Sequence, residues 1–249
     1  MQFLLDSGHL ASSTKMSAYS SLLKKLSILN ISQAEKSHLI RILCQSIASD
    51  CPEKQQKNED VALVSMLSKA ITSFSPEGQL VSRKGYQWRG YLPCFNEERI
   101  QSLKKESNQL RKFATHATKH LLLEGAPIAS ELLVNKDVVN CICKQICCDV
   151  KLKPSSTFYH WYDSPSHRVE PHVDIPEFGL SVLMLLSHNH KTENRKSSFF
   201  VYPPGATAQK INLAIGEAII LFSGSVVHAR SAPAPGETVS TVSWGFKII

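Results

Sequence analysis

The chain has 249 residues, of which 43% are hydrophobic and 20% charged, and its formal net charge is +7. This composition is that of an ordinary soluble globular protein, long enough for one large domain or for a catalytic domain with a small extension. No apolar run approaches the roughly 20 residues that span a bilayer, and the N-terminus lacks the basic and apolar regions of a signal peptide. We therefore expect a cytoplasmic protein with no membrane partner.

The excess of Lys and Arg is dispersed along helical segments rather than gathered in a block with interleaved aromatic residues. This distribution favours an anionic small molecule over nucleic acid as the binding partner. Four of the seven cysteines lie in residues 141–148, without the paired spacing of zinc ligands. We interpret them as small apolar side chains on a helix, and nothing in their spacing implies disulfides.

The first part of the chain has the hydrophobic periodicity of helices. Leucines at helical spacing predict a helix in residues 17–30, and Ser32 and Glu35 stand in capping-box register at the start of a second helix that ends at residue 48. The polar residues 51–60 indicate a loop.

Further helices are expected up to about residue 150. One covers residues 59–74, and the aromatic residues and glycines of 85–95 then indicate short strands or a turn. A long amphipathic segment from Asn96 to Gly125 is predicted to be helical. His116 and His120 are expected to be partly exposed on it.

The pattern changes after Lys151. Short β-branched or aromatic runs are divided by Pro, Gly, Ser and Asn, which is typical of a β-sandwich or barrel, here a jelly roll. The predicted strands are residues 156–162, 179–187, 197–203, 208–213, 217–222, 225–229 and 238–247.

A candidate metal site lies among these strands. His172 and Asp174 are two residues apart, so on a strand both side chains point to the same side. His228 follows the apolar run 217–222 and offers a third ligand. Two histidines and one carboxylate on one face of a metal suit non-haem Fe(II) enzymes that activate dioxygen, although zinc is also chemically possible.

These motifs, together with the lead-in segment 90–103, a short strand followed by a helix, resemble the 2-oxoglutarate- and Fe(II)-dependent oxygenases, closest to the prolyl-4-hydroxylase-like group. The resemblance covers about residues 84–249. It implies an α+β protein whose core is a double-stranded β-helix, the cupin-like jelly roll, with N-terminal helices packed on the outside. It also implies a helical N-terminal extension, residues 1–83, and an oxygenase domain, residues 84–249, with supporting helices of its own.

The resemblance further implies Fe(II) as cofactor, held by His172, Asp174 and His228, with 2-oxoglutarate and O2 as cosubstrates. The reaction would couple oxidative decarboxylation of 2-oxoglutarate to oxidation of a C–H bond in a small molecule, an amino acid or a natural-product intermediate. In the related halogenases a small residue stands in place of Asp174, so a carboxylate favours hydroxylation or a similar oxidation.

One feature departs from the family. An Arg or Lys normally stands about ten residues after the distal histidine and pairs with the far carboxylate of 2-oxoglutarate, but here that position is Thr238. Arg230, two residues after His228, is our candidate replacement because it should point to the same side of its strand. Ser240 and Tyr159 are candidate hydrogen-bond partners for the same carboxylate.

The organic substrate is not identified by the sequence. Trp161 and Arg168 are candidate substrate residues. Trp161 is otherwise a core aromatic residue, and Arg168 is also a less favoured substitute for the missing cation. Two alternatives stay open, an iron oxygenase of the same fold that does not use 2-oxoglutarate and a non-catalytic jelly-roll binding module. The sequence does not determine the oligomeric state.

Overall fold

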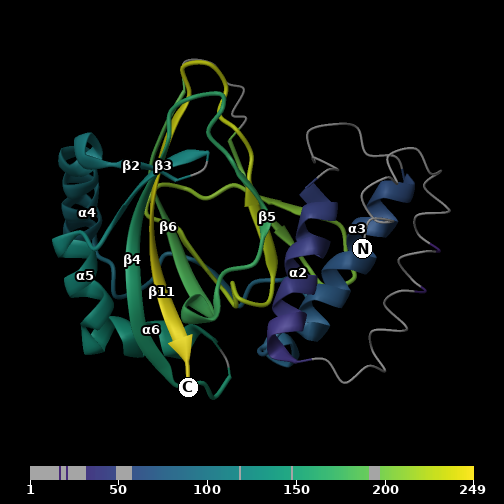
Figure 1. Cartoon of the computed structure of the whole chain (residues 1–249). Coiled ribbons are helices and arrows are strands. Elements are labelled where there is room, and N and C mark those ends of the chain that lie inside the picture. Colours follow the sequence, from purple (N-terminus) through teal and green to yellow (C-terminus); the bar gives the residue numbers. More distant parts are fainter. Residues whose placement is uncertain are drawn as a thin grey trace.

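The computed structural model describes residues 32–48, 58–117, 119–146, 148–190 and 197–249, together with Ser17 and Ser21. The helix expected at 17–30 and most of the loop expected at 51–60 fall outside the described residues. Two β-sheets lie face to face, and helices cover both outer surfaces (Figure 1). The predicted α+β architecture with a jelly-roll core and N-terminal helices on the outside is confirmed.

Within the described residues the larger sheet has seven strands in the order β1-β9-β6-β11-β4-β3-β2, and the smaller has four in the order β5-β10-β7-β8. All neighbouring strands pair antiparallel. The strands are β1 (Trp88–Gly90), β2 (Thr115–Ala117), β3 (His120–Glu124), β4 (Leu152–Tyr162), β5 (Val169–His172), β6 (Leu180–Asn189), β7 (Phe199–Tyr202), β8 (Gln209–Ile211), β9 (Ala218–Leu221), β10 (Val227–Arg230) and β11 (Thr238–Ile248). Each of the seven strands predicted after Lys151 is present.

Side-chain alternation along β4 and β11 determines what faces the interior. Trp244 and Tyr159 point outward, where they join a hydrophobic cluster that also contains residues of the covering helices. Ser243 and Phe158 point inward, between the two sheets. The strands therefore bury apolar residues on both faces, as expected for a sheet that is covered on both sides.

The described helices are α2 (Gln33–Ala48), α3 (Asn58–Phe74), α4 (Glu97–Leu110), α5 (Pro127–Val134) and α6 (Lys136–Ile146). The capping box is confirmed, because the backbone N–H of Ser32 donates to Glu35 Oε2 at 2.7 Å and the N–H of Glu35 donates to Ser32 Oγ at 3.3 Å. None of the described helices is long and apolar enough to cross a membrane.

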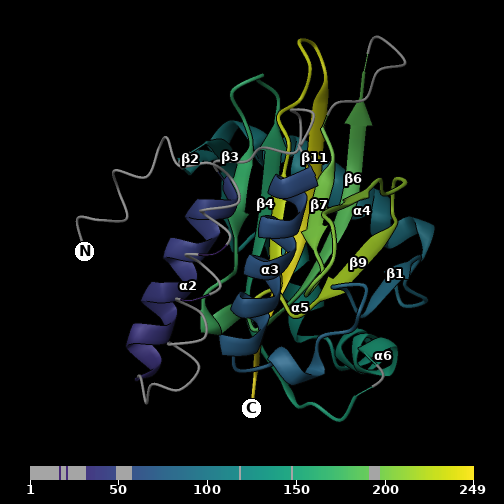
Figure 2. The same cartoon turned by 90° about the vertical axis from the view of Figure 1, so that its right-hand side faces the viewer.

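The helices α2 and α3 cover the smaller sheet (Figure 2). Leu43 of α2 and Leu67 of α3 are fully buried in a cluster with Val227 and Ala229 of β10. The hydroxyl of Thr72 donates to the backbone carbonyl of Ser225 at 3.0 Å. This layer therefore supports the strand that carries His228.

The amphipathic segment from Asn96 to Gly125 is not one helix, and this prediction was wrong. The helix α4 ends at Leu110, and residues 115–117 and 120–124 pair as the antiparallel strands β2 and β3. The apolar run of β3 pairs with β4 along its whole length, so tertiary strand pairing overrides the helical periodicity of the sequence. His120 is consequently a buried strand residue.

Candidate metal centre

The three candidate ligands come from neighbouring parts of the smaller sheet. His172 ends β5, Asp174 follows it, and His228 lies directly opposite His172 on β10. One carboxylate oxygen of Asp174 lies 3.4 Å from Nε2 of His172 and 3.6 Å from Nε2 of His228. One ligand atom from each residue lies within 4.8 Å of the other two, so the three can hold one ion.

Hydrogen bonds orient these ligands. The Nδ1–H groups of His172 and His228 have backbone carbonyls as partners, Glu170 O at 2.9 Å and Val226 O at 3.0 Å. Each Nε2 is then left with its lone pair directed at the common point, which is how metal-binding histidines are usually fixed. The hydroxyl of Ser181 donates to the second oxygen of Asp174 at 3.2 Å.

The three side chains interact strongly with one another. Burial by itself raises the pKa of Asp174, but the adjacent His228 and His172 more than offset burial and hold that pKa well below its ordinary value. Burial by itself lowers the pKa of His172, and the Asp174 carboxylate reverses this effect. The donor set of two imidazoles and one ionised carboxylate therefore fits Fe(II), as the sequence predicts.

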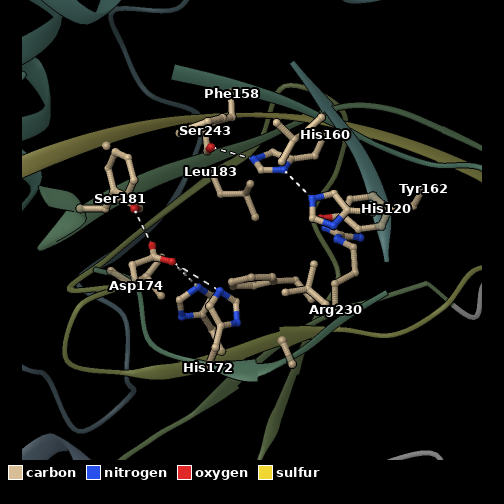
Figure 3. A pocket seen from close by; sticks show the side chains of 18 residues that line it. His120, Phe158, His160, Tyr162, His172, Asp174, Ser181, Leu183, Arg230 and Ser243 are labelled. Atoms are coloured by element: carbon tan, nitrogen blue, oxygen red, sulfur yellow. Dashed lines mark hydrogen bonds and ion pairs between the residues drawn. The ribbon is translucent and has the colours of Figure 1, made fainter. Parts of the chain in front are cut away.

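The ligands line a cavity of about 220 Å³ between the sheets (Figure 3). Its walls are largely apolar, and Asp174 is the one carboxylate among the described lining residues. The other lining residues are His120, Leu122, Phe158, His160, Tyr162, Val169, Phe178, Ser181, Leu183, Phe199, Leu221, Ala229, Arg230, Ser243 and Gly245.

Arg230 lies at one end of this cavity. Its side chain is buried, its guanidinium carbon lies 5.1 Å from the centre of the Tyr162 ring, and it donates a long hydrogen bond of 3.4 Å to Ser197 Oγ. Burial lowers the pKa of Arg230, but an arginine remains charged inside proteins. The cavity therefore joins a candidate metal site to a buried cation.

The other predicted cosubstrate residues lie elsewhere. The hydroxyl of Tyr159 donates to Glu106 at 2.7 Å beneath the helices, and the Ser240 hydroxyl shares a 2.6 Å hydrogen bond with Ser187. Thr238 accepts a hydrogen bond from Asn189 at the start of β11. The structure does not bring these residues to the cavity wall, because strand alternation points Tyr159 and Ser240 to the outer face.

The two candidate substrate residues are also outside the cavity. Trp161 is buried on the outer face of β4, with the Arg111 guanidinium 5.9 Å from its ring centre. Arg168 is exposed and donates to Glu170 at 2.7 Å. Of the cations that the sequence suggested, the structure places Arg230 alone at the wall of the cavity within the described part of the chain.

Sequence reasoning missed several polar residues of the cavity, among them Ser181, which donates to Asp174. His120, expected on a helix, and His160, in the predicted strand 156–162, both line the cavity, and so does Ser243. The signal was present for His160, which lies two residues from both Phe158 and Tyr162 in a predicted strand and therefore shares their face. No such signal existed for His120, whose strand was not predicted.

Comparisons with known proteins agree on the fold. No family model and no curated protein matches the chain. A prolyl-4-hydroxylase from Pseudomonas putida matches with a TM-score of 0.52 and 13% identity, over 68% of this chain and 96% of its own. The α-ketoglutarate-dependent epimerase SnoN from nogalamycin biosynthesis matches with a TM-score of 0.54 and 12% identity, over 68% and 82%.

A third similar structure is EctD from S. alaskensis, with a TM-score of 0.51 and 12% identity, over 68% of this chain and 74% of its own. The chain thus has the fold of the 2-oxoglutarate- and Fe(II)-dependent oxygenases, and the resemblance predicted from its sequence is confirmed at that level.

Proposed function

We propose that the protein is an Fe(II)- and 2-oxoglutarate-dependent oxygenase that oxidises a C–H bond of a small molecule. The observation that carries this proposal is the presence of His172, Asp174, His228 and the buried Arg230 on the wall of one cavity. Similar structures support the ligand classes. SnoN was solved with Fe3+, α-ketoglutarate and nogalamycin RO, and HygX from Streptomyces hygroscopicus with nickel, 2-oxoglutarate and hygromycin B.

In this proposal each residue has a defined task. His172, Asp174 and His228 would hold Fe(II), which when bound would supply the activation of dioxygen. Ser181 keeps the Asp174 carboxylate in place through its hydrogen bond. Arg230 pairs with the far carboxylate of 2-oxoglutarate in a charge-assisted contact, replacing the cation that Thr238 does not provide.

The apolar walls complete the site. Phe178, Leu183 and Leu221 line the cavity, and such apolar surroundings strengthen the pairing of Arg230 with a carboxylate. Asp174 would be a ligand where the related halogenases have a small residue, so hydroxylation or a related oxidation is the expected outcome. A cytoplasmic location is part of the same proposal.

The test is reconstitution. The protein is loaded with Fe(II) under anaerobic conditions, supplied with 2-oxoglutarate and O2, and assayed for succinate, with His228→Ala as the variant and His38→Gln, an exposed helix residue, as the control. We expect succinate from the wild type and the control and none from His228→Ala. Iron binding without succinate would favour the oxygenase that does not use 2-oxoglutarate, and absence of iron binding would favour a non-catalytic module.

A further inference from the structure

Three polar side chains form a hydrogen-bonded chain across the larger sheet, on the cavity wall opposite the metal centre (Figure 3). They come from three adjacent strands, His120 from β3, His160 from β4 and Ser243 from β11. His160 Nε2 lies 2.9 Å from Ser243 Oγ, and His160 Nδ1 lies 3.2 Å from His120 Nε2. We call these three residues the histidine chain.

The fold does not require polar residues here. The neighbouring inward positions on the same strands are Leu122, Phe158 and Tyr162, and an apolar side chain at His160 would continue that wall. Burying polar groups in a cavity costs stability unless their hydrogen bonds are satisfied. Local exceptions of this kind to an otherwise apolar pattern are typical of functional sites.

One end of the histidine chain is open. Among the described residues none forms a hydrogen bond with Nδ1 of His120, whose ring is stacked on Tyr162 with 5.1 Å between centres. The hydroxyl of Ser243 has one hydrogen-bond partner among them, His160. A hydroxyl can form further hydrogen bonds, so both ends can accept a ligand.

At neutral pH both imidazoles of the histidine chain are uncharged, because their pKa values are lowered. Burial, followed by repulsion from His120 and Arg230, lowers the pKa of His160 to about 3. Burial, followed by repulsion from His167 and His172, lowers the pKa of His120 to about 4. Because a neutral imidazole has one donor and one acceptor, a change of tautomer along the chain exchanges donor for acceptor at its ends.

The cavity therefore has two polar regions of different character. Arg230 offers a fixed positive charge, suited to a carboxylate. The histidine chain offers exchangeable neutral donors and acceptors, suited to a group that itself both donates and accepts. A carboxylate bound to the histidine chain would lose its hydration without gaining a positively charged partner from the chain. An ammonium group needs acceptors alone, whereas the histidine chain presents donors as readily as acceptors.

We propose that His120, His160 and Ser243 form the subsite for the organic substrate, and that they bind a hydroxyl or primary amide on a small, otherwise apolar molecule. Its small size follows from the cavity volume of about 220 Å³, below the roughly 300–1,000 Å³ of ordinary ligand pockets. This assignment rests on the proposed function, in which Arg230 binds the cosubstrate and the histidine chain is left for the organic substrate.

The test uses four probes with one carbon skeleton, isopentanol, isovaleramide, isovalerate and isopentylammonium. Each is titrated into the protein saturated with Zn(II) and 2-oxoglutarate and labelled with 15N at histidine, and the ring resonances of His120 and His160 report binding. We expect isopentanol and isovaleramide to shift these resonances, and the two charged probes to bind at least about tenfold more weakly. Equal or tighter binding of isovalerate would overturn the assignment.

Two variants test the residues themselves. His160→Phe and Ser243→Ala each remove hydrogen bonds of the chain, so each should weaken isopentanol binding about three- to tenfold, the worth of one hydrogen bond. His38→Gln should leave it unchanged. Unchanged binding in Ser243→Ala, whose smaller alteration leaves the fold least disturbed, would also overturn the assignment.

The same samples separate this assignment from the proposed function. Binding of 2-oxoglutarate is measured by calorimetry before any probe is added. Failure of 2-oxoglutarate to bind contradicts the proposed function, and the response to isopentanol still decides the role of the histidine chain. Binding of 2-oxoglutarate with no preference for the neutral probes contradicts the histidine chain alone.

Discussion

The neutral histidines of the cavity make stability depend on pH. In the unfolded chain an imidazole takes up a proton near pH 6.5, whereas in the folded protein His120 and His160 stay neutral until about pH 4 and 3. The unfolded state therefore binds more protons in between, and folded-state stability is lost as the pH falls from about 6.5 toward 4.

The variant His160→Phe isolates this effect. Urea unfolding of the metal-free protein at pH 7 and pH 4.5 should show a loss of unfolding free energy that is about 2–3 kcal/mol smaller in the variant than in the wild type. The same pH dependence in both proteins would show that His160 is not held neutral by the fold.

A glycine permits the close approach of an aromatic ring to β11. A Cβ atom at Gly245 would lie 2.1 Å from Cδ1 of Phe178, so the ring must move if any side chain is added. Gly245→Ala should lower the free energy of unfolding by about 1–3 kcal/mol, as overpacking does. Adding Phe178→Ala should recover part of the loss, and an additive loss in urea unfolding would contradict the clash.

At the residue scale, the sequence predicted those site residues that are related by a fixed spacing along the chain. His228 and Arg230 lie two apart on β10 and therefore share a face. Asp174 lies two residues after His172, just beyond the end of β5, and is also close to the metal point. Tyr159 and Ser240 were harder because β4 and β11 carry buried residues on both faces. In such strands hydrophobicity does not reveal which face turns inward.

At the scale of elements, β10 depends on the helix layer behind it. Leu67 of α3 is fully buried beside Val227 and Ala229, the neighbours of His228. Leu67→Ala should lower the free energy of unfolding by about 2–5 kcal/mol, the usual cost of such a cavity. Urea denaturation measures it, with Lys69→Ala, exposed on the same helix, as the control. Equal stability of the two variants would contradict the packing of α3 against β10.

Elements were predicted well where local patterns and tertiary contacts agree. The capping box at Ser32 and the seven strands after Lys151 are examples. The strands β2 and β3 were missed because their leucines fit a helical period equally well, and pairing with β4 decides the outcome. That pairing joins residues about 40 apart in sequence, as His160 and Leu122 do, which no local pattern reveals.

At the scale of the whole molecule, the jelly roll places a candidate metal ligand and the proposed carboxylate-binding arginine on one strand. His228 and Arg230 both face the cavity from β10, while the smaller sheet supplies the remaining metal ligands and the larger sheet the histidine chain. The predicted division at residue 83 stays a prediction, and α3 packs its buried face against the smaller sheet across that boundary.

The most direct test of the central claim is a titration of 2-oxoglutarate into the anaerobic Fe(II) protein, followed by the metal-to-ligand charge-transfer band. Loss of one partner of a buried ion pair costs about 3–5 kcal/mol, which is two to three or more powers of ten in affinity. Arg230→Ala should therefore raise the half-saturating concentration at least about a hundredfold while iron binding is kept, and the exposed Arg168→Ala should match the wild type. A titration of Arg230→Ala that coincides with that of the wild type would contradict the claim.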